Sequence, residues 1–164
     1  DVFNSFKNTV EQNNDKNNFL SLANSRSRLR MTTLYYFAGI NRCLVAGTGN
    51  KVEDFGIGFY TKYGDGGVDI SPIADLNKTD VFEISKILGV LDEIIKAKPT
   101  DGLWDDGRTD EDQIGATYKE LEWAMQQKDL NKKLIDFKGR EKEVFQILKK
   151  LEKKENLRVY FLMR

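Results

Sequence analysis

The stretch from Gly47 to Lys78 combines the residue types that handle phosphates and metal ions. Within it, glycines alternate with carboxylates and lysines between short apolar runs. Glycine lets the backbone turn with positive φ or approach another group closely. Carboxylates bind hard cations such as Mg²⁺, and lysines bind phosphate as point charges. The stretch therefore predicts a loop where phosphates and a metal ion meet, because an ordinary structural loop needs turn residues but not these charges.

The composition excludes several kinds of chemistry. Histidine is absent and Cys43 is the only cysteine, so Ser-His-Asp and Cys-His catalysis, histidine-ligated metals and an internal disulfide are excluded within this chain. A lone cysteine is typical of a reducing compartment, and we expect the cytoplasm. The length of 164 residues suits a single domain, 1–164. The formal net charge of +0 predicts no nucleic-acid partner. No apolar run reaches a membrane-spanning length, so we expect no membrane partner.

One segment could place this stretch at the edge of a sheet. Residues 42–48 form a short apolar run next to a glycine, which predicts a buried strand of a parallel sheet with Cys43 inside it. Ligands of open α/β sheets bind at the carboxyl ends of strands, and Thr48 lies at such an end. Since one strand cannot form a sheet, its neighbours are missing from this chain or come from elsewhere. We therefore predict an α/β fold that is helix-rich in this chain.

Helices account for most of the remaining sequence. Periodicity and capping residues predict them at residues 2–10, 22–38, 77–88, 91–97, 117–127 and 141–154. The polar segment 13–18 separates the first two, and the apolar run 159–163 predicts a last strand or an arm onto a partner. Residues 101–122 are acidic and the tail from residue 128 is rich in lysine, which we interpret as two solvated surfaces of opposite charge.

Five sequence words resemble the ammonia-dependent NAD synthetases, members of the N-type ATP pyrophosphatase group. They are RLRMTTLY (28–35), GTGNKVE (47–53), GFYTKYGDGGVDISPIADLNK (58–78), KPTDGLW (98–104) and TDEDQIGATYKELE (109–122). They occur in the family's order, which is far more specific than a lone glycine motif. The resemblance implies an open parallel-sheet, Rossmann-like adenine nucleotide alpha-hydrolase fold, of which this chain is an incomplete domain.

The resemblance also implies a ligase that acts in NAD biosynthesis. In the family's reaction, ATP adenylates the nicotinate carboxylate of deamido-NAD and pyrophosphate leaves. Ammonia then attacks the acyl-adenylate, and AMP leaves as NAD forms. The implied partners are therefore deamido-NAD, ammonia and ATP as co-substrate, with Mg²⁺ as cofactor. The family further implies a homodimer with the substrate near the interface.

Four residues match the family's ATP and metal positions. By resemblance, Glu53 is the magnesium ligand, and Thr48, Lys78 and Thr100 contact ATP. The residue types suit these roles, because Mg²⁺ commonly takes one or two protein carboxylates together with phosphate oxygens. A lysine ammonium offsets charge that develops on a leaving pyrophosphate. Without the resemblance, Glu53 and Lys78 would be interpreted as solvated surface side chains.

A second group of residues matches the deamido-NAD positions. By resemblance, Arg28, Lys62 and Asp69 contact the dinucleotide, and Asp65 lies near its nicotinate end, where it helps to deprotonate the incoming ammonium. A guanidinium clamps phosphate or carboxylate with two hydrogen bonds, and ammonium must lose a proton before it can attack. Arginines alternate along residues 26–30, so they spread around a helix, and we expect the others to be solvated or at an interface.

Two parts of the family's pattern do not occur in this sequence. The SGGxDS loop, which holds the triphosphate and supplies a second magnesium carboxylate, is absent, as is a His-Lys pair near the C-terminus. We therefore expect this chain alone not to turn over. Three interpretations stay open: a portion of a full NAD synthetase, a truncated non-catalytic homologue with partial nucleotide binding, or an interaction module built on the charged helices.

Overall fold

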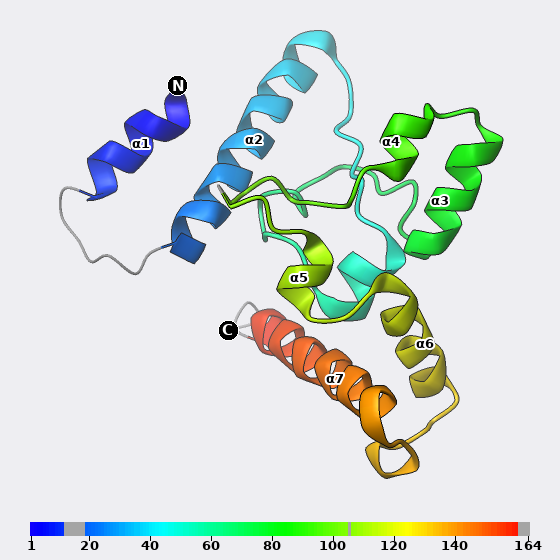
Figure 1. The fold of residues 1–164 in the computed structure, drawn as a ribbon. Helices are drawn as coiled ribbons and strands as arrows, with labels where there is room; N and C mark the ends of the chain where they lie inside the picture. The colour runs from blue at the N-terminus through cyan, green and yellow to red at the C-terminus, as the bar shows by residue number, and fades with distance from the viewer. Residues whose placement is uncertain (12–18, 105, 161–164) are drawn as a thin grey trace.

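A computed structural model describes residues 1–11, 19–104 and 106–160 (Figure 1). These residues form helices α1 (Val2–Glu11), α2 (Phe19–Asn41), α3 (Lys78–Ile87), α4 (Asp92–Lys96), α5 (Asp110–Ile114), α6 (Tyr118–Asp129) and α7 (Gly139–Tyr160), a π-helix η1 (Lys51–Ile57) and a 3-10 helix η2 (Leu134–Asp136). All six helices predicted from the sequence are present, and α2 and α7 are longer than predicted. The polar segment 13–18 lies outside the described residues.

The best-packed part of the molecule is the layer formed by η1, α6 and α7. Its core contains Val52, Ile57, Ala116, Tyr118, Leu121, Ala124, Phe137, Val144, Phe145 and Leu148. The side chains of Val144 and Leu148 are almost fully buried and stand one helical turn apart, as the amphipathic pattern of residues 141–154 predicts. Helices α6 and α7 run side by side in Figure 1 and share this core. Burial in this layer therefore fixes η1, the element that carries Glu53.

Capping residues define where the shorter helices begin. Asn50 accepts hydrogen bonds from the Val52 and Glu53 amides at 3.0 and 3.1 Å, which starts η1, and Gly58 ends it with a φ of 61°. The predicted capping box at Thr117 is confirmed: its hydroxyl accepts from the Glu120 amide, and the Thr117 amide donates to the Glu120 carboxylate at 2.8 Å. Each cap satisfies amides that the helix itself leaves unpaired.

The strand predicted over residues 42–48 is reduced to one isolated parallel bridge between Ala46 and Ile70. The Gly47 amide donates to the Ile70 carbonyl at 2.7 Å, so the segment pairs on one side. Most of its residues are exposed, and Cys43, predicted to be buried, is an exposed free thiol. The physical reason is that a strand needs paired neighbours and covered faces, and among the described residues the backbone of Val45 and Gly47 pairs only with residues 69–70, on one side.

Helix α2 stands apart from the packed layer, with α1 alongside it (Figure 1). The Arg26 guanidinium lies 4.2 Å from the ring centre of Phe3, which joins the two helices. In the described part of the chain no helix is both long and apolar enough to cross a membrane. At the other end, Val159 and Tyr160 belong to α7, so the predicted strand is wrong for them, and residues 161–163 lie outside the description.

Candidate functional site

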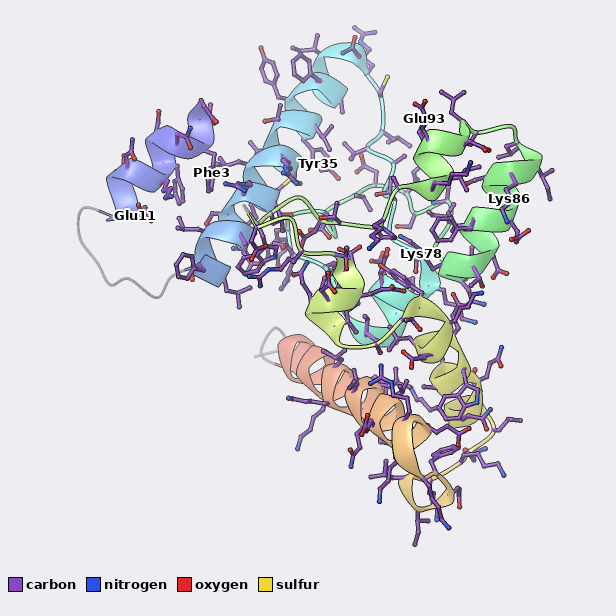
Figure 2. All side chains as sticks on the ribbon, in the orientation of Figure 1. Phe3, Glu11, Tyr35, Lys78, Lys86 and Glu93 are labelled. Atoms are coloured by element: carbon purple, nitrogen blue, oxygen red, sulfur yellow. The ribbon has the colours of Figure 1, made fainter. Side chains whose placement is uncertain are left out.

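Glu53 and Lys78 meet in the structure. The Lys78 ammonium lies 2.8 Å from the Glu53 Oε1 atom, and the two side chains are only 18% and 13% exposed. The backbone explains the meeting: the Lys51 amide donates to the Leu76 carbonyl at 2.8 Å, which brings the start of η1 beside the start of α3. Figure 2 shows Lys78 at that first turn of α3, near the middle of the molecule. The predicted metal ligand and the predicted phosphate-binding cation thus form one ion pair.

Two residues that the sequence reasoning did not select complete this arrangement. The Tyr118 hydroxyl lies 2.6 Å from Glu53 Oε1 and 3.1 Å from Asp110 Oδ2, and the Lys78 ammonium lies 4.9 Å from the centre of its ring. Burial, followed by the hydrogen bond to Glu53, raises the pKa of the Tyr118 hydroxyl. Burial also raises the pKa of the Asp110 carboxyl above its ordinary value. We call Glu53, Lys78, Asp110 and Tyr118 the Glu53 cluster.

The two threonines predicted to contact ATP lie at the edges of this region. Thr48 is exposed, directly after the Ala46 bridge. Thr100 is also exposed, and its hydroxyl donates to the Arg108 carbonyl at 3.2 Å. The segment before it is tied to the Glu53 cluster, because the Asp110 amide donates to the Pro99 carbonyl at 3.1 Å. The structure records no hydrogen bond between either threonine and the Glu53–Lys78 pair.

The predicted deamido-NAD residues gather where α2 meets the turn at residues 60–67. The Arg28 Nε donates to the Lys62 carbonyl at 3.1 Å, and the Lys62 ammonium lies 4.4 Å from the ring centre of Tyr63. The Asp65 Oδ1 atom accepts from the Ser27 hydroxyl at 2.7 Å and from the Thr61 amide at 3.0 Å. The turn and the helix thereby hold three of the predicted side chains on neighbouring backbone.

Asp69 links the same helix to the extended segment. Its carboxylate accepts from the Val45 amide at 2.8 Å and from the Tyr35 hydroxyl at 3.1 Å, so each oxygen atom has a donor. Desolvation, followed by the hydrogen bond to Asp69 and its negative charge, raises the pKa of the Tyr35 hydroxyl. We call Arg28, Lys62, Asp65 and Asp69 the Arg28 group.

The other two arginines of α2 donate hydrogen bonds to the loop at residues 101–103. Arg26 donates to the Leu103 carbonyl at 2.9 Å, and Arg30 donates to the Asp101 and Gly102 carbonyls at 3.0 and 2.8 Å. The three arginines thus serve different partners, as expected, but Arg26 and Arg30 bond to a loop of the same chain, whereas the sequence predicted solvated or interface positions. The loop they hold follows Thr100 directly, so α2 reaches both sides of the candidate site.

No local signal marks Asp110 or Tyr118 as members of the site. Asp110 is one of many acidic residues between 101 and 122, and Tyr118 resembles a core aromatic that follows a capping residue. Their selection depends on a contact between Tyr118 and Glu53 across 65 positions of the chain. A buried carboxyl oxygen without a partner, Asp110 Oδ1, is the clue that only the structure supplies.

Comparison with solved structures defines the class of this fold. A Francisella tularensis protein described as NMN synthetase is 36% identical and superposes with a TM-score of 0.69, over 76% of this chain and 50% of that chain. An NH3-dependent NAD synthetase from Campylobacter jejuni superposes with a TM-score of 0.66 at 24% identity, which shows the fold alone, over 93% of this chain and 57% of that one. The chain therefore has an α/β fold of the adenine nucleotide alpha-hydrolase class, as predicted, and is helix-rich.

Comparison of sequences identifies the family. A model of the family described as NAD synthase matches residues 1–159, so the chain belongs to that family. An NH(3)-dependent NAD(+) synthetase from Carboxydothermus hydrogenoformans is 47% identical over 133 residues, which cover 81% of this chain and 53% of that protein. One from Thermoplasma volcanium is 52% identical over 102 residues, which cover 62% and 41%. The chain thus spans about half, or less, of the length of these curated relatives.

Proposed function

We propose that the protein containing this chain forms NAD by amidating deamido-NAD with ammonia, using ATP and an acyl-adenylate intermediate. The observation that carries the proposal is the 2.8 Å contact between Lys78 and Glu53. It joins a cation suited to phosphate with a carboxylate suited to a divalent metal, in a chain of the NAD synthase family. In this structure the two side chains neutralise each other's charge. When a nucleotide binds with its metal ion, a phosphate can replace Glu53 as the partner of Lys78, and the metal ion can replace Lys78 as the partner of Glu53.

Glu53 fits a magnesium ion whose other ligands come from the nucleotide. The described residues contain no cluster of three or more histidine, cysteine or acidic side chains able to hold a metal by themselves. Mg²⁺ does not need such a cluster, because it keeps waters and binds phosphate oxygens beside one or two carboxylates. When bound, the ion would supply charge neutralisation at the phosphates, and Glu53 is the residue we propose to hold it.

The remaining proposed ATP contacts are Lys78, Thr48 and Thr100. An ammonium directed at the phosphates stabilises charge that accumulates on pyrophosphate as its bond to the α-phosphorus breaks. Lys78 stands at the first turn of α3, where the positive end of the helix dipole also favours a negative ligand. The two threonine hydroxyls are exposed and can reorient toward a ligand at modest cost.

The Arg28 group is proposed to hold deamido-NAD. In the described part of the chain neither Arg28 nor Lys62 is paired with a carboxylate, so both charges are available to an anionic ligand. Asp69 has its oxygen atoms engaged by Val45 and Tyr35, which orients it rigidly. Asp65 is a carboxylate fixed by two donors, and we propose it as the base that takes a proton from ammonium before nitrogen attacks the acyl carbon.

A second candidate product is NMN, the mononucleotide. The specific observation in its favour is the 36% identity and TM-score of 0.69 with the Francisella protein described as NMN synthetase. The chemistry at the carboxylate would be the same, and only the length of the nucleotide attached to it would differ. Comparing deamido-NAD with its mononucleotide as substrate distinguishes the two products.

We also infer that the protein acts as a homodimer in the cytoplasm. Leu34, Phe37 and Ile40 are more than half exposed along α2, where a second copy could cover them. The exposed free thiol of Cys43 is compatible with a reducing compartment. Sedimentation of the protein at several concentrations tests the dimer, and a monomer at all of them would contradict it.

A chimera tests the proposed reaction directly. In it, this chain replaces the matching residues of the Carboxydothermus hydrogenoformans synthetase, and pyrophosphate, AMP and NAD are measured with ATP, Mg²⁺, ammonium and deamido-NAD. We expect equal amounts of AMP and NAD, and no AMP from the isolated chain. Absence of both products from a folded chimera, under conditions where the parent synthetase is active, would refute the proposal.

A further inference from the structure

The Tyr118 hydroxyl lies between two carboxylates. Its oxygen is 2.6 Å from Glu53 Oε1 and 3.1 Å from Asp110 Oδ2. Tyr118 is 4% exposed and Asp110 is 6% exposed, so both residues are shielded from bulk solvent. A hydrogen bond between two oxygen atoms requires that one of them carries a proton. Which of the three groups donates therefore depends on which of them are protonated.

Counting protons orders the three groups. A tyrosine has a single O–H, so it can donate to one carboxylate only, and the shorter contact identifies Glu53 as the acceptor. The contact with Asp110 is then favourable if the Asp110 carboxyl keeps its proton and donates to the tyrosine oxygen. Asp110 Oδ1 is buried without a partner, which an ionised carboxylate would tolerate poorly. The order that satisfies every contact is Asp110 to Tyr118 to Glu53.

Helix α6 fixes both members of the Glu53–Lys78 pair from one face. Glu122 lies one turn after Tyr118, and its carboxylate accepts from the Thr79 amide at 3.0 Å and from the Thr79 hydroxyl at 2.7 Å. Thr79 follows Lys78 in the first turn of α3. The ring of Tyr118 also lies near the Lys78 ammonium, at 4.9 Å. Thus α6 places the start of α3 through Glu122 and the Glu53 carboxylate through Tyr118.

We propose that Tyr118 is a positioning residue, oriented by Asp110, that keeps Glu53 in place when Lys78 leaves it for a phosphate. If nucleotide binding separates the pair, Glu53 loses its cation, and the Tyr118 hydroxyl is the contact that preserves its side-chain conformation. The functional half of this statement rests on the proposed function. The geometric half, that Tyr118 and Asp110 determine the conformation of Glu53, stands on the contacts alone.

The first experiment uses this chain without any ligand and with Lys78→Ala in every variant, because Lys78 otherwise also holds Glu53. Three-bond NMR couplings of Glu53 report whether its side chain occupies one rotamer or several. We expect one rotamer in the Lys78→Ala parent, which serves as the wild type here, and when Asp110→Asn is added, because the amide can still donate to the tyrosine oxygen. We expect averaging over several in Tyr118→Phe and in Asp110→Ala, which remove the donor or its support. Tyr36→Phe, at a tyrosine that is 66% exposed on α2, is the matched control and should match the wild type.

The outcomes are decisive in either direction. A single Glu53 rotamer in folded Tyr118→Phe and Asp110→Ala would overturn the proposal, as would averaging in Asp110→Asn equal to that in Asp110→Ala. If Tyr118→Phe does not fold, Asp110→Ala decides the question. If both variants unfold, the two residues are core contacts and not positioning residues, and the proposal fails.

The second experiment adds a functional readout in the chimera described above. We expect Tyr118→Phe to raise the Mg²⁺ concentration needed for half-maximal pyrophosphate release by about tenfold, as for loss of a hydrogen bond to a charged group. The KM for deamido-NAD should stay within about twofold, since the Arg28 group is untouched. An unchanged Mg²⁺ requirement would overturn the functional half. If the unsubstituted chimera releases no pyrophosphate, the proposed function fails, while the rotamer measurement still decides the positioning role.

Discussion

The Glu53 cluster and the Arg28 group satisfy their charges in different ways. In the cluster, side chains satisfy one another: Lys78 pairs with Glu53, and the Tyr118 hydroxyl joins Glu53 to Asp110. In the Arg28 group, the charged side chains form most of their hydrogen bonds with neutral groups. Arg28 donates to a backbone carbonyl, and Asp65 accepts from a hydroxyl and an amide. The first arrangement must be broken before a charged ligand enters, whereas the second leaves cationic charge available.

The difference follows from packing. Tyr118 is part of the core that η1, α6 and α7 share, so the cluster is anchored in the best-buried layer of the molecule. The Arg28 group lies on α2 and its adjoining turn, where Arg28, Asp65 and Asp69 are exposed. A buried ion must be paired because its desolvation is costly, and an exposed one need not be. Substitutions should therefore affect stability and chemistry together in the cluster, but ligand affinity alone at Arg28 and Lys62.

The largest effect is expected when the Glu53–Lys78 pair is broken. In the chimera, Lys78→Ala and Glu53→Gln should each slow pyrophosphate release by about 10²–10³-fold, the usual cost of removing one preorganised electrostatic contact. Stopped assays of pyrophosphate measure this step apart from amidation.

Lys86→Ala is the matched control for that loss. Lys86 lies on the same helix, is 56% exposed and pairs with Glu83 at 2.7 Å, so its removal should leave the rate unchanged. Normal pyrophosphate release by both Lys78→Ala and Glu53→Gln would remove the basis for the proposed ATP site.

The second prediction compares leucines in the two regions. Leu121 is 0% exposed and Leu34 is 56% exposed. Leu121→Ala should lower the free energy of unfolding by about 2–5 kcal/mol through lost burial and a cavity. Leu34→Ala should change it by less than about 0.5 kcal/mol in the monomer. Urea unfolding followed by circular dichroism measures both, and equal losses would show that α2 is as well packed as α6.

The sequence predicted helices well because their signals are local. The capping residues Asn77 and Thr117 and the spacing of Val144 and Leu148 each act within one or two turns, and the structure contains the corresponding helices. The segment 42–48 was predicted to be a buried strand, but it forms only an isolated bridge. An apolar run shows that burial is possible, but it does not show that a neighbouring strand is present. The short helices α5 and η1 were missed, because neither has a run of periodic residues long enough to detect.

Every residue of the candidate site that the sequence predicted lies in a motif shared with the family. The pairing of Glu53 with Lys78 was not predicted as a contact, although both residues were chosen for compatible roles. Asp110 and Tyr118 were missed, since a buried hydrogen bond between distant positions leaves no local trace. The roles of the chosen residues, and the assignment of 1–164 to a single domain, stay predictions that the experiments above address.

The third prediction concerns affinity in the Arg28 group. Arg28→Gln in the chimera should raise the KM for deamido-NAD by about tenfold, because the lost charge contributes to binding before and during the reaction alike. The kcat should change by less than about threefold. Arg28→Lys should raise the KM less than Arg28→Gln does, since an ammonium keeps the charge but lacks the planar pair of donors. Arg42→Gln, at an exposed arginine beyond the end of α2, serves as the control. A fall in kcat with unchanged KM would place Arg28 with the catalytic groups instead.

The smallest predicted effect is a pH dependence of opposite sign at two carboxyls on neighbouring helices. The Arg140 guanidinium lowers the pKa of Glu120 from 4.5 to about 2, whereas burial raises the pKa of Asp110 from 3.8. The contribution of Glu120 to stability is therefore present above pH 4.5 and is lost as the pH falls through about 2. The contribution of Asp110 is present below pH 3.8 and is lost as the pH rises through its folded pKa.

Two variants separate these contributions. Arg140→Gln keeps the Thr117 capping box but removes the guanidinium, so the loss of stability between pH 4.5 and about 2 should shrink, by less than about 1 kcal/mol because the pair is solvent-exposed. Asp110→Asn should instead flatten the decline of stability above pH 3.8. Urea midpoints measured from pH 2 to pH 7 test both slopes. A steeper acid-side loss in Arg140→Gln, or an unchanged slope in Asp110→Asn, would contradict the contrast between an exposed ion pair and a buried neutral carboxyl.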